Sequence, residues 1–145
     1  MRLPASIGAR LRRLPLPVLL VLIMSACSIS GPSYDEFARR VSAWPGTPSE
    51  DCGVGLLGEA SRETALECAQ RAIAEGRPFA VIVQVQGIDS NLFQGLASRG
   101  RRDSFLFWFD SDITGGGGPG AESRLTERPC TDPAVTTNDL PLECQ

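Results

Sequence analysis

Five cysteines carry the clearest chemistry in the sequence. Four of them form two spaced pairs, Cys52 with Cys68 and Cys130 with Cys144, separated by 15 and 13 intervening residues. In a small chain exported to an oxidising compartment, this set predicts two disulfides. Of the three possible pairings we favour these two, because each closes a short loop and removes about 3 kcal/mol of unfolded-state freedom. Zinc is the alternative, but structural zinc prefers closely spaced ligands, and the chain has no histidine.

The fifth cysteine, Cys27, stands at the end of an apolar stretch. Four arginines lie among residues 1–13, and residues 14–26 then carry no charge and end in small side chains. A membrane-spanning helix needs about 20 apolar residues. This stretch is shorter and contains two prolines, so it predicts an export signal. Met24-Ser25-Ala26-Cys27 resembles the lipobox of bacterial lipoproteins, in which a signal peptidase cuts before an acylated cysteine.

The resemblance implies a signal peptide over 1–26, a lipid-anchored tether over 27–32 and a small domain over 33–145. A covalent lipid such as palmitate on Cys27 would hold the protein in the cell envelope. Because Ser28 rather than Asp follows the cysteine, the resemblance also implies the outer membrane, facing the periplasm, in a cell with two membranes. The alternative is an ordinary secretory signal with a cysteine nearby by chance. That alternative leaves an odd thiol in an oxidising compartment, whereas acylation leaves an even set.

Removal of residues 1–26 limits the size of the protein and changes its charge. The 119 residues that remain of 145 suffice for one small domain. All 17 acidic residues but only 10 of the 14 arginines remain, which gives a formal charge of −7. A nucleic-acid partner, which requires a basic surface, is therefore not expected. The chain has neither lysine nor histidine, which excludes an imidazole base and a lysine Schiff base.

Asp110, Asp112 and Thr114 follow an apolar segment and begin a glycine-rich stretch that ends at Gly120. Their spacing matches the first half of an EF-hand calcium loop, but the position of the bidentate glutamate holds Ala121. The two aspartates also resemble the first motif of haloacid dehalogenase-like phosphatases, a family that needs a lysine and a much larger domain. The remaining alternative is a plain loop after a strand, which commonly uses Asp, Thr and Gly. We favour that loop and expect no bound metal.

Arg99, Arg101 and Arg102 form a compact basic cluster in an acidic domain. At a hairpin turn, such a cluster is a local positive surface that could contact phosphates or carboxylates of the envelope. The simpler interpretation is a solvated turn.

The elements that must position these residues follow from the sequence pattern. Ser33 and Glu36 have the spacing of a capping box and begin a helix that ends near Trp44. Its apolar stripe faces either the core of the domain, which we favour, or the membrane surface. Residues 45–60 are rich in Pro and Gly and predict a loop. A second helix is predicted from a Ser61 cap to Gly76.

Strands are predicted after the second helix, over residues 79–88, 92–98, 104–110 and, more weakly, 122–128. Two helices followed by a meander of strands favour an α+β fold. We expect two short helices on one face of a small antiparallel sheet of three to four strands, stapled by the two disulfides.

A binding or interaction module of the envelope is the function that these features favour. Its partner would be an envelope protein or an anionic glycan or lipid, contacted through residues 99–102 and 110–120. The missing histidine and lysine, with no recognisable pair of nucleophile and base, argue against an enzyme. Two alternatives stay open: a small glycosidase-like enzyme, for which a carboxylate pair suffices, and a calcium-binding envelope protein. No cofactor is expected beyond the lipid on Cys27.

Overall fold

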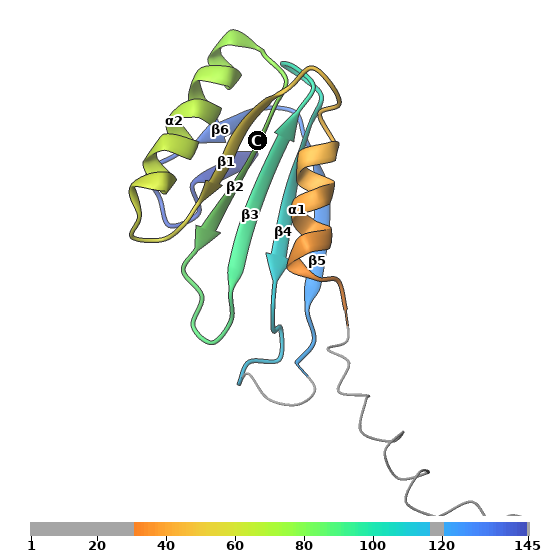
Figure 1. The fold of residues 1–145 in the computed structure, drawn as a ribbon, viewed down its shortest axis with the longest axis vertical. Helices are drawn as coiled ribbons and strands as arrows, with labels where there is room; N and C mark the ends of the chain where they lie inside the picture. Colours follow the sequence, from red (N-terminus) through yellow and green to blue (C-terminus); the bar gives the residue numbers. More distant parts are fainter. Residues whose placement is uncertain (1–30, 117–120, 145) are drawn as a thin grey trace, which may run out of the picture.

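The computed structural model describes residues 31–116 and 121–144. The predicted signal peptide, the lipobox and Cys27 lie outside the described residues, as do residues 117–120 and Gln145. Figure 1 shows the arrangement of the elements. In chain order they are α1 (Tyr34–Ala43), β1 (Glu50–Gly55), α2 (Ala60–Glu75), β2 (Phe79–Val85), β3 (Leu92–Ser98), β4 (Ser104–Asp110), β5 (Arg124–Cys130), β6 (Pro133–Val135) and β7 (Leu142–Cys144).

Five strands form one mixed sheet in the order β1-β2-β3-β4-β5, and β6 and β7 form a separate hairpin. The meander from β2 to β5 is antiparallel, as predicted, and β3 and β4 have the predicted bounds. β1 lies within residues 45–60, for which the sequence predicts a loop, and it pairs in parallel with β2. The predictions of a loop there and of a purely antiparallel sheet of three to four strands are therefore wrong.

The composition of β1 explains why its strand was hard to predict. Its sequence EDCGVG is rich in Asp, Glu and Gly, which are depleted in strands. The pairing with β2 is irregular between Asp51 and Val54, and Gly53 adopts a φ of 76° within that irregular segment. Tertiary contacts with β2 and α2, rather than local preference, therefore hold this segment extended.

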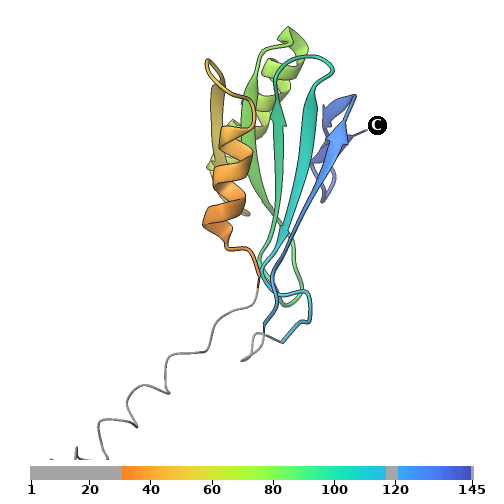
Figure 2. The ribbon, with the colours of Figure 1, turned by 90° about the vertical axis from the view of Figure 1, so that its right-hand side faces the viewer.

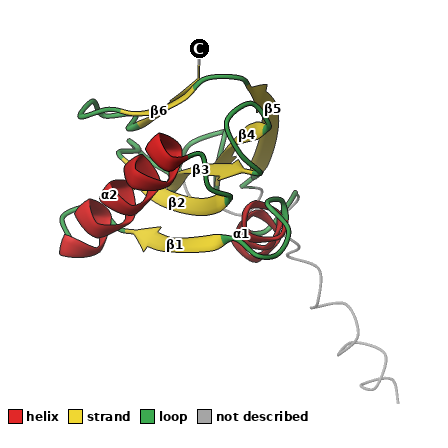
Figure 3. Cartoon of the chain, turned by 90° about the horizontal axis from the view of Figure 1, so that it is seen from above, coloured by secondary structure: helices red, strands yellow, loops and turns green. Residues whose placement is uncertain are grey.

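The two helices lie on opposite faces of the sheet, not on one face as predicted. Alternate residues of β2 explain the arrangement, because Val81 and Val83 pack with α2 while Ala80 and Ile82 pack with α1. A strand that is apolar on both sides needs cover on both sides. Figures 2 and 3 show α1 on one side of the sheet, with α2 and the β6–β7 hairpin on the other.

Helix α1 packs against the sheet of its own domain, which was the favoured of the two predictions for its apolar stripe. Ser33 caps the helix, because its hydroxyl accepts a hydrogen bond from the Glu36 amide at 3.1 Å. Phe37 and Val41 are fully buried. Gly95 of β3 permits this close approach, since a Cβ there would lie 2.5 Å from a methyl group of Val41.

Helix α2 begins two residues earlier than a Ser61 cap predicts, and Gly76 ends it as predicted. The N-cap is Glu59, while the Ser61 hydroxyl accepts a hydrogen bond from the Leu56 amide at 3.2 Å. Gly76 ends the helix with a left-handed φ of 67°. Among the described residues, no helix has the length and apolar content needed to cross a membrane.

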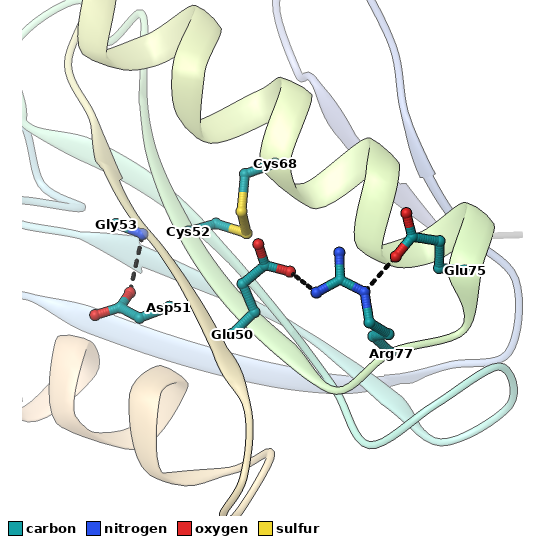
Figure 4. Close-up of a disulfide and its surroundings, with 7 residues drawn as sticks. All are labelled: Glu50, Asp51, Cys52, Gly53, Cys68, Glu75 and Arg77. Carbon is teal, nitrogen blue, oxygen red and sulfur yellow. Dashed lines mark hydrogen bonds and ion pairs between the residues drawn. A yellow bond between two sulfur atoms is a disulfide. The ribbon is translucent and has the colours of Figure 1, made fainter.

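Both predicted disulfides are confirmed. Cys52–Cys68 joins β1 to α2, and Figure 4 shows it beside Arg77, which forms ion pairs with Glu50 and Glu75. Cys130–Cys144 joins the last residue of β5 to the last residue of β7. Each bridge therefore ties an edge strand of the sheet to the layer that covers it.

The meander gives the sheet two distinct ends (Figure 1). We call one the tether end, because the chain joins α1 there at residues 31–33, beside the 86–91 connection and the described residues 111–116 and 121–123 that follow β4. We call the other the arginine end, because it carries the turn 99–103 between β3 and β4. The turn precedes β4 and the glycine-rich loop follows it, so the prediction that these segments lie at opposite ends is confirmed for their described residues.

Candidate functional site

An apolar pocket of about 540 Å³ opens at the tether end. Its aromatic wall is built from three elements: Tyr34 is the first residue of α1, Phe93 lies on β3 and Phe109 lies opposite it on β4. The ring centroids of Tyr34 and Phe93 are 4.7 Å apart, and those of Tyr34 and Phe109 are 6.1 Å apart. The described residues that complete the lining are Gly31, Pro32, Ser33, Asn91, Ser111 and Ser123.

The polar groups at the rim of the pocket form hydrogen bonds that join neighbouring segments of the chain. The Ser123 hydroxyl donates to the Pro32 carbonyl at 2.6 Å. Across the rim, the Asn91 amide donates to the Ser111 hydroxyl at 2.8 Å. Gly31 lies so close to Ser123 that a Cβ would come within 2.4 Å of its carbonyl oxygen. These contacts fix the position at which the tether reaches the domain, immediately beside the pocket.

Tyr34 is the one titratable residue among the described residues that line the pocket. Burial raises the pKa of its phenol above 10, and the neighbouring Asp35 carboxylate raises it further. The phenol is therefore neutral at physiological pH. A neutral hydroxyl on a largely apolar wall suits an uncharged, apolar ligand or surface better than an ion.

The aspartates of the predicted half EF-hand organise their own loop. Asp110 accepts a hydrogen bond from the Asp112 amide at 3.0 Å. Asp112, which is 7% exposed, accepts bonds from the Thr114 amide at 3.1 Å and from its hydroxyl at 2.6 Å. Such side-chain bonds to the backbone two residues on are typical of turns.

Potential metal ligands converge elsewhere. In the described part of the chain, three such side chains meet only at Glu50, Cys52 and Cys68. There both sulfurs belong to the disulfide and Glu50 is paired with Arg77 (Figure 4). Asp110, Asp112 and Thr114 form a folded turn through their own hydrogen bonds.

The three arginines of the predicted cluster have different surroundings at the arginine end. Arg99 is attached to the end of α1, since its Nε donates to the Trp44 carbonyl at 2.9 Å and its guanidinium lies 4.3 Å from the Trp44 ring centroid. Arg101 extends over Gly76, where a Cβ would lie 2.9 Å from its side chain. All three arginines are exposed, and Arg99 differs from the other two by its contacts with Trp44. Arg99 therefore has a structural role, and the other two present their charges to solvent.

A hollow of about 350 Å³ adjoins this cluster. Arg101 lines it together with Arg77, Ser98 and Asp132. Because Arg77 forms ion pairs with two glutamates, the positive charge available to a ligand here comes mainly from Arg101.

A third hollow, of about 440 Å³, lies between the sheet and the β6–β7 hairpin. Trp108, Arg128 and Glu143 are among its lining residues. The hairpin is fixed above the sheet by buried Gln94, whose side chain exchanges two hydrogen bonds of 3.2 Å with the backbone of Leu142. This hollow, the groove beside Trp108, was not predicted from the sequence, because residues 133–144 carry only two three-residue strands and have no periodic pattern. The only sequence signal was the placement of Trp108 on the face of its strand opposite the three phenylalanines.

No family model matches the chain, and comparisons with curated proteins and with solved structures find no match either. The chemistry of the pocket, of the arginine end and of the groove is therefore the basis for assigning a function.

Proposed function

We propose that this protein is a lipid-anchored protein of the cell envelope that acts by binding a partner. Its lipid is carried by Cys27, and in a cell with two membranes it faces the periplasm from the outer membrane. One observation carries the proposal: the two disulfides use the other four cysteines of the chain. Cys27 is thus left without a cysteine partner in its own chain, at the position where the lipobox resemblance requires acylation.

The position of the tether supports an anchor that holds the domain in one orientation. Four residues lead from Cys27 to Gly31, a span of at most about 14 Å. The Ser123 hydroxyl then fixes the Pro32 carbonyl to the domain. The tether end therefore stays near the membrane. The arginine end projects about 24 Å farther, the length of a seven-residue strand.

The arginine end is the binding surface that this orientation favours. Arg101 and Arg102 are exposed there, beside the hollow that Arg101 lines. In an acidic domain they form a local positive surface, which would attract an anionic glycan, a lipid headgroup or an acidic protein surface. Arg99 contributes indirectly, because its contact with Trp44 fixes the turn that carries the other two.

The anchor is tested by Cys27→Ser. The substitution removes the acylated thiol, so the protein should move from the membrane fraction to the soluble or unprocessed pool. The double variant Cys130→Ser/Cys144→Ser is the matched control, because it also removes cysteines but leaves the anchor, and it should stay in the membrane fraction. Membrane fractionation that is unchanged by Cys27→Ser would contradict the proposal.

The binding surface is tested by cross-linking in intact cells. The double variant Arg101→Ser/Arg102→Ser should lose captured partners, and the wild-type capture should weaken at high salt. Arg39→Ser/Arg71→Ser is charge-matched and lies on the exposed surfaces of the two helices. It should capture the same partners as wild type. If Arg101→Ser/Arg102→Ser captures the same partners as the wild-type protein, the arginine end is not the binding surface, and the groove beside Trp108 becomes the candidate.

A further inference from the structure

The tether end carries an apolar side chain that nothing in the domain covers. Ile88 lies in the turn between β2 and β3 and is 98% exposed, whereas the other large exposed apolar residues, Val54 and Leu140, are 41% and 47% exposed. The turn is close to the loop after β4, since a Cβ on Gly115 would lie 3.8 Å from an Asp89 carboxylate oxygen. Exposure of this degree leaves the hydrophobic free energy of a large side chain available to an external surface.

The apolar pocket opens at the same end as Ile88. Asn91, which ends the turn that carries Ile88, lines the pocket together with Tyr34 and Phe109. The tether reaches the domain at the same place, because Gly31 and Pro32 also line the pocket. One end of the molecule thus combines an exposed aliphatic side chain, an aromatic pocket and the point at which the anchor segment leaves the domain.

We propose that the tether end rests on the bilayer and that Ile88 inserts at the boundary between headgroups and acyl chains. This inference rests on the proposed acylation of Cys27. The four residues from Cys27 to Gly31 span at most about 14 Å, so an anchored domain keeps this end at the surface of the membrane. Apolar and aromatic side chains of peripheral proteins are stabilised at that depth, and the pocket mouth then faces lipid instead of water.

The charge of the tether end selects the type of lipid. Asp35, Asp89 and Glu122 are exposed at this end, and they outnumber the exposed Arg124 that begins β5. Carboxylates at this position are repelled by anionic headgroups. The surface that fits is therefore a neutral, zwitterionic phospholipid surface, and added anionic lipid should weaken the contact at low salt.

The test uses the lipidated protein from membranes, reconstituted in phosphatidylcholine vesicles with and without brominated acyl chains. Ile88→Trp places an indole at the proposed insertion point. Leu140→Trp is the control, because it also replaces an exposed aliphatic residue but lies beside the middle of the sheet, in the groove with Trp108 and Thr126. The emission of the native Trp44 and Trp108, measured on the wild-type protein with and without brominated chains, is subtracted from that of each variant.

The indole of Ile88→Trp should lie about 5–10 Å into the headgroup and acyl boundary, where brominated acyl chains should strongly quench its emission. The indole of Leu140→Trp should show little quenching. Equal quenching of the two variants, or quenching that becomes stronger with anionic lipid, would contradict the proposal that Ile88 inserts into the membrane. An intact mass without the acyl group would instead refute the anchor, so the two failures are distinguishable.

A second measurement needs no substitution. Tyr34 is the only tyrosine of the chain, so tyrosinate absorbance reports the pocket alone. Contact with phosphatidylcholine vesicles should move its ionisation to higher pH, because lipid excludes water from the pocket mouth. If vesicles leave the ionisation curve of Tyr34 unchanged, the pocket stays open to water, and the proposed contact between the tether end and the membrane is contradicted.

Discussion

At the tether end, rings from α1, β3 and β4 meet around an apolar pocket. The arginine end has one aromatic pair, Trp44 with Phe105 at 4.8 Å, and its other contacts join charged and polar groups. Phe109 is 3% exposed and its ring centroid lies 5.6 Å from that of Phe37. Arg99 is joined to Trp44 by one hydrogen bond and a cation–π contact, and its 3.9 Å pair with Asp103 is exposed.

The difference teaches where stability and recognition reside in this fold. Buried aromatic packing contributes several kcal/mol for each large side chain, while exposed ion pairs contribute about 0–1 kcal/mol. Changes to the buried rings at the tether end should therefore act mainly on folding, whereas a change to exposed Ile88 should not. Changes at the arginine end should act mainly on partners, with Arg99 as the exception.

Phe109→Ala should have the largest effect. The substitution leaves a cavity between α1 and the sheet and should lower the free energy of unfolding by about 3–5 kcal/mol, measured by urea denaturation. Phe105→Ala is the matched control on the same face and strand, toward the arginine end. Phe105 is only half-buried, so its truncation should cost less. An equal loss for the two variants would remove the contrast between the ends.

The Cys130–Cys144 bridge tests whether the arginine end depends on a covalent link. The double variant Cys130→Ala/Cys144→Ala should lower stability by about 2–5 kcal/mol. It should also release β7, so that the Leu142 amide, which donates to Gln94 at 3.2 Å, loses its protection from hydrogen exchange. Retained protection would indicate that the hairpin is held by side-chain packing alone.

Arg99→Ala should cost about 1–2 kcal/mol, because it removes an exposed cation–π contact and one hydrogen bond. Arg102→Ala, in the same turn, should change stability by less than about 0.5 kcal/mol. Thermal unfolding of the two variants measures the difference. If both are neutral, the turn is not fixed by Trp44 and the three arginines are equivalent.

Tyr34 should produce the smallest effect and one that depends on pH. Its pKa is raised in the folded protein by burial, so folding favours the neutral phenol. That stability is complete below the pKa of an unfolded tyrosine, about 10, and is lost as the pH rises through the folded value. Tyr34→Phe should therefore flatten the alkaline decline of stability. A wild-type tyrosinate titration at or below pH 10 would contradict the burial of this ring.

Strong local patterns predicted much of the fold. The alternating phenylalanines of 104–110 and the Ser33 cap correspond to β4 and to the start of α1. β1 was not predictable, because its acidic and glycine-rich sequence becomes a strand only through β2 and Cys68. The prediction of both helices on one face was wrong for a related reason. β2 is apolar on both faces, and its need for cover on each side decides where the helices lie.

The candidate site was less accessible from the sequence than the fold. Arg99, Arg101 and Arg102 were identified as one cluster, but only the proximity of Trp44, 55 residues away in sequence, separates Arg99 from the others. The pocket also depends on residues distant in sequence, since Tyr34 meets Phe93 and Phe109 through the docking of α1. A single apolar residue in a turn, such as Ile88, becomes informative only when its exposure and its end of the sheet are known.

The central claim is that Cys27 anchors the domain by its tether end. Intact mass measurement of the mature protein extracted from membranes tests it most directly. The account predicts a chain that begins at Cys27, carries the added mass of acyl groups and retains the mass of two closed disulfides. A mature chain that begins elsewhere, or one that begins at Cys27 with a free and unmodified thiol, would contradict the anchor.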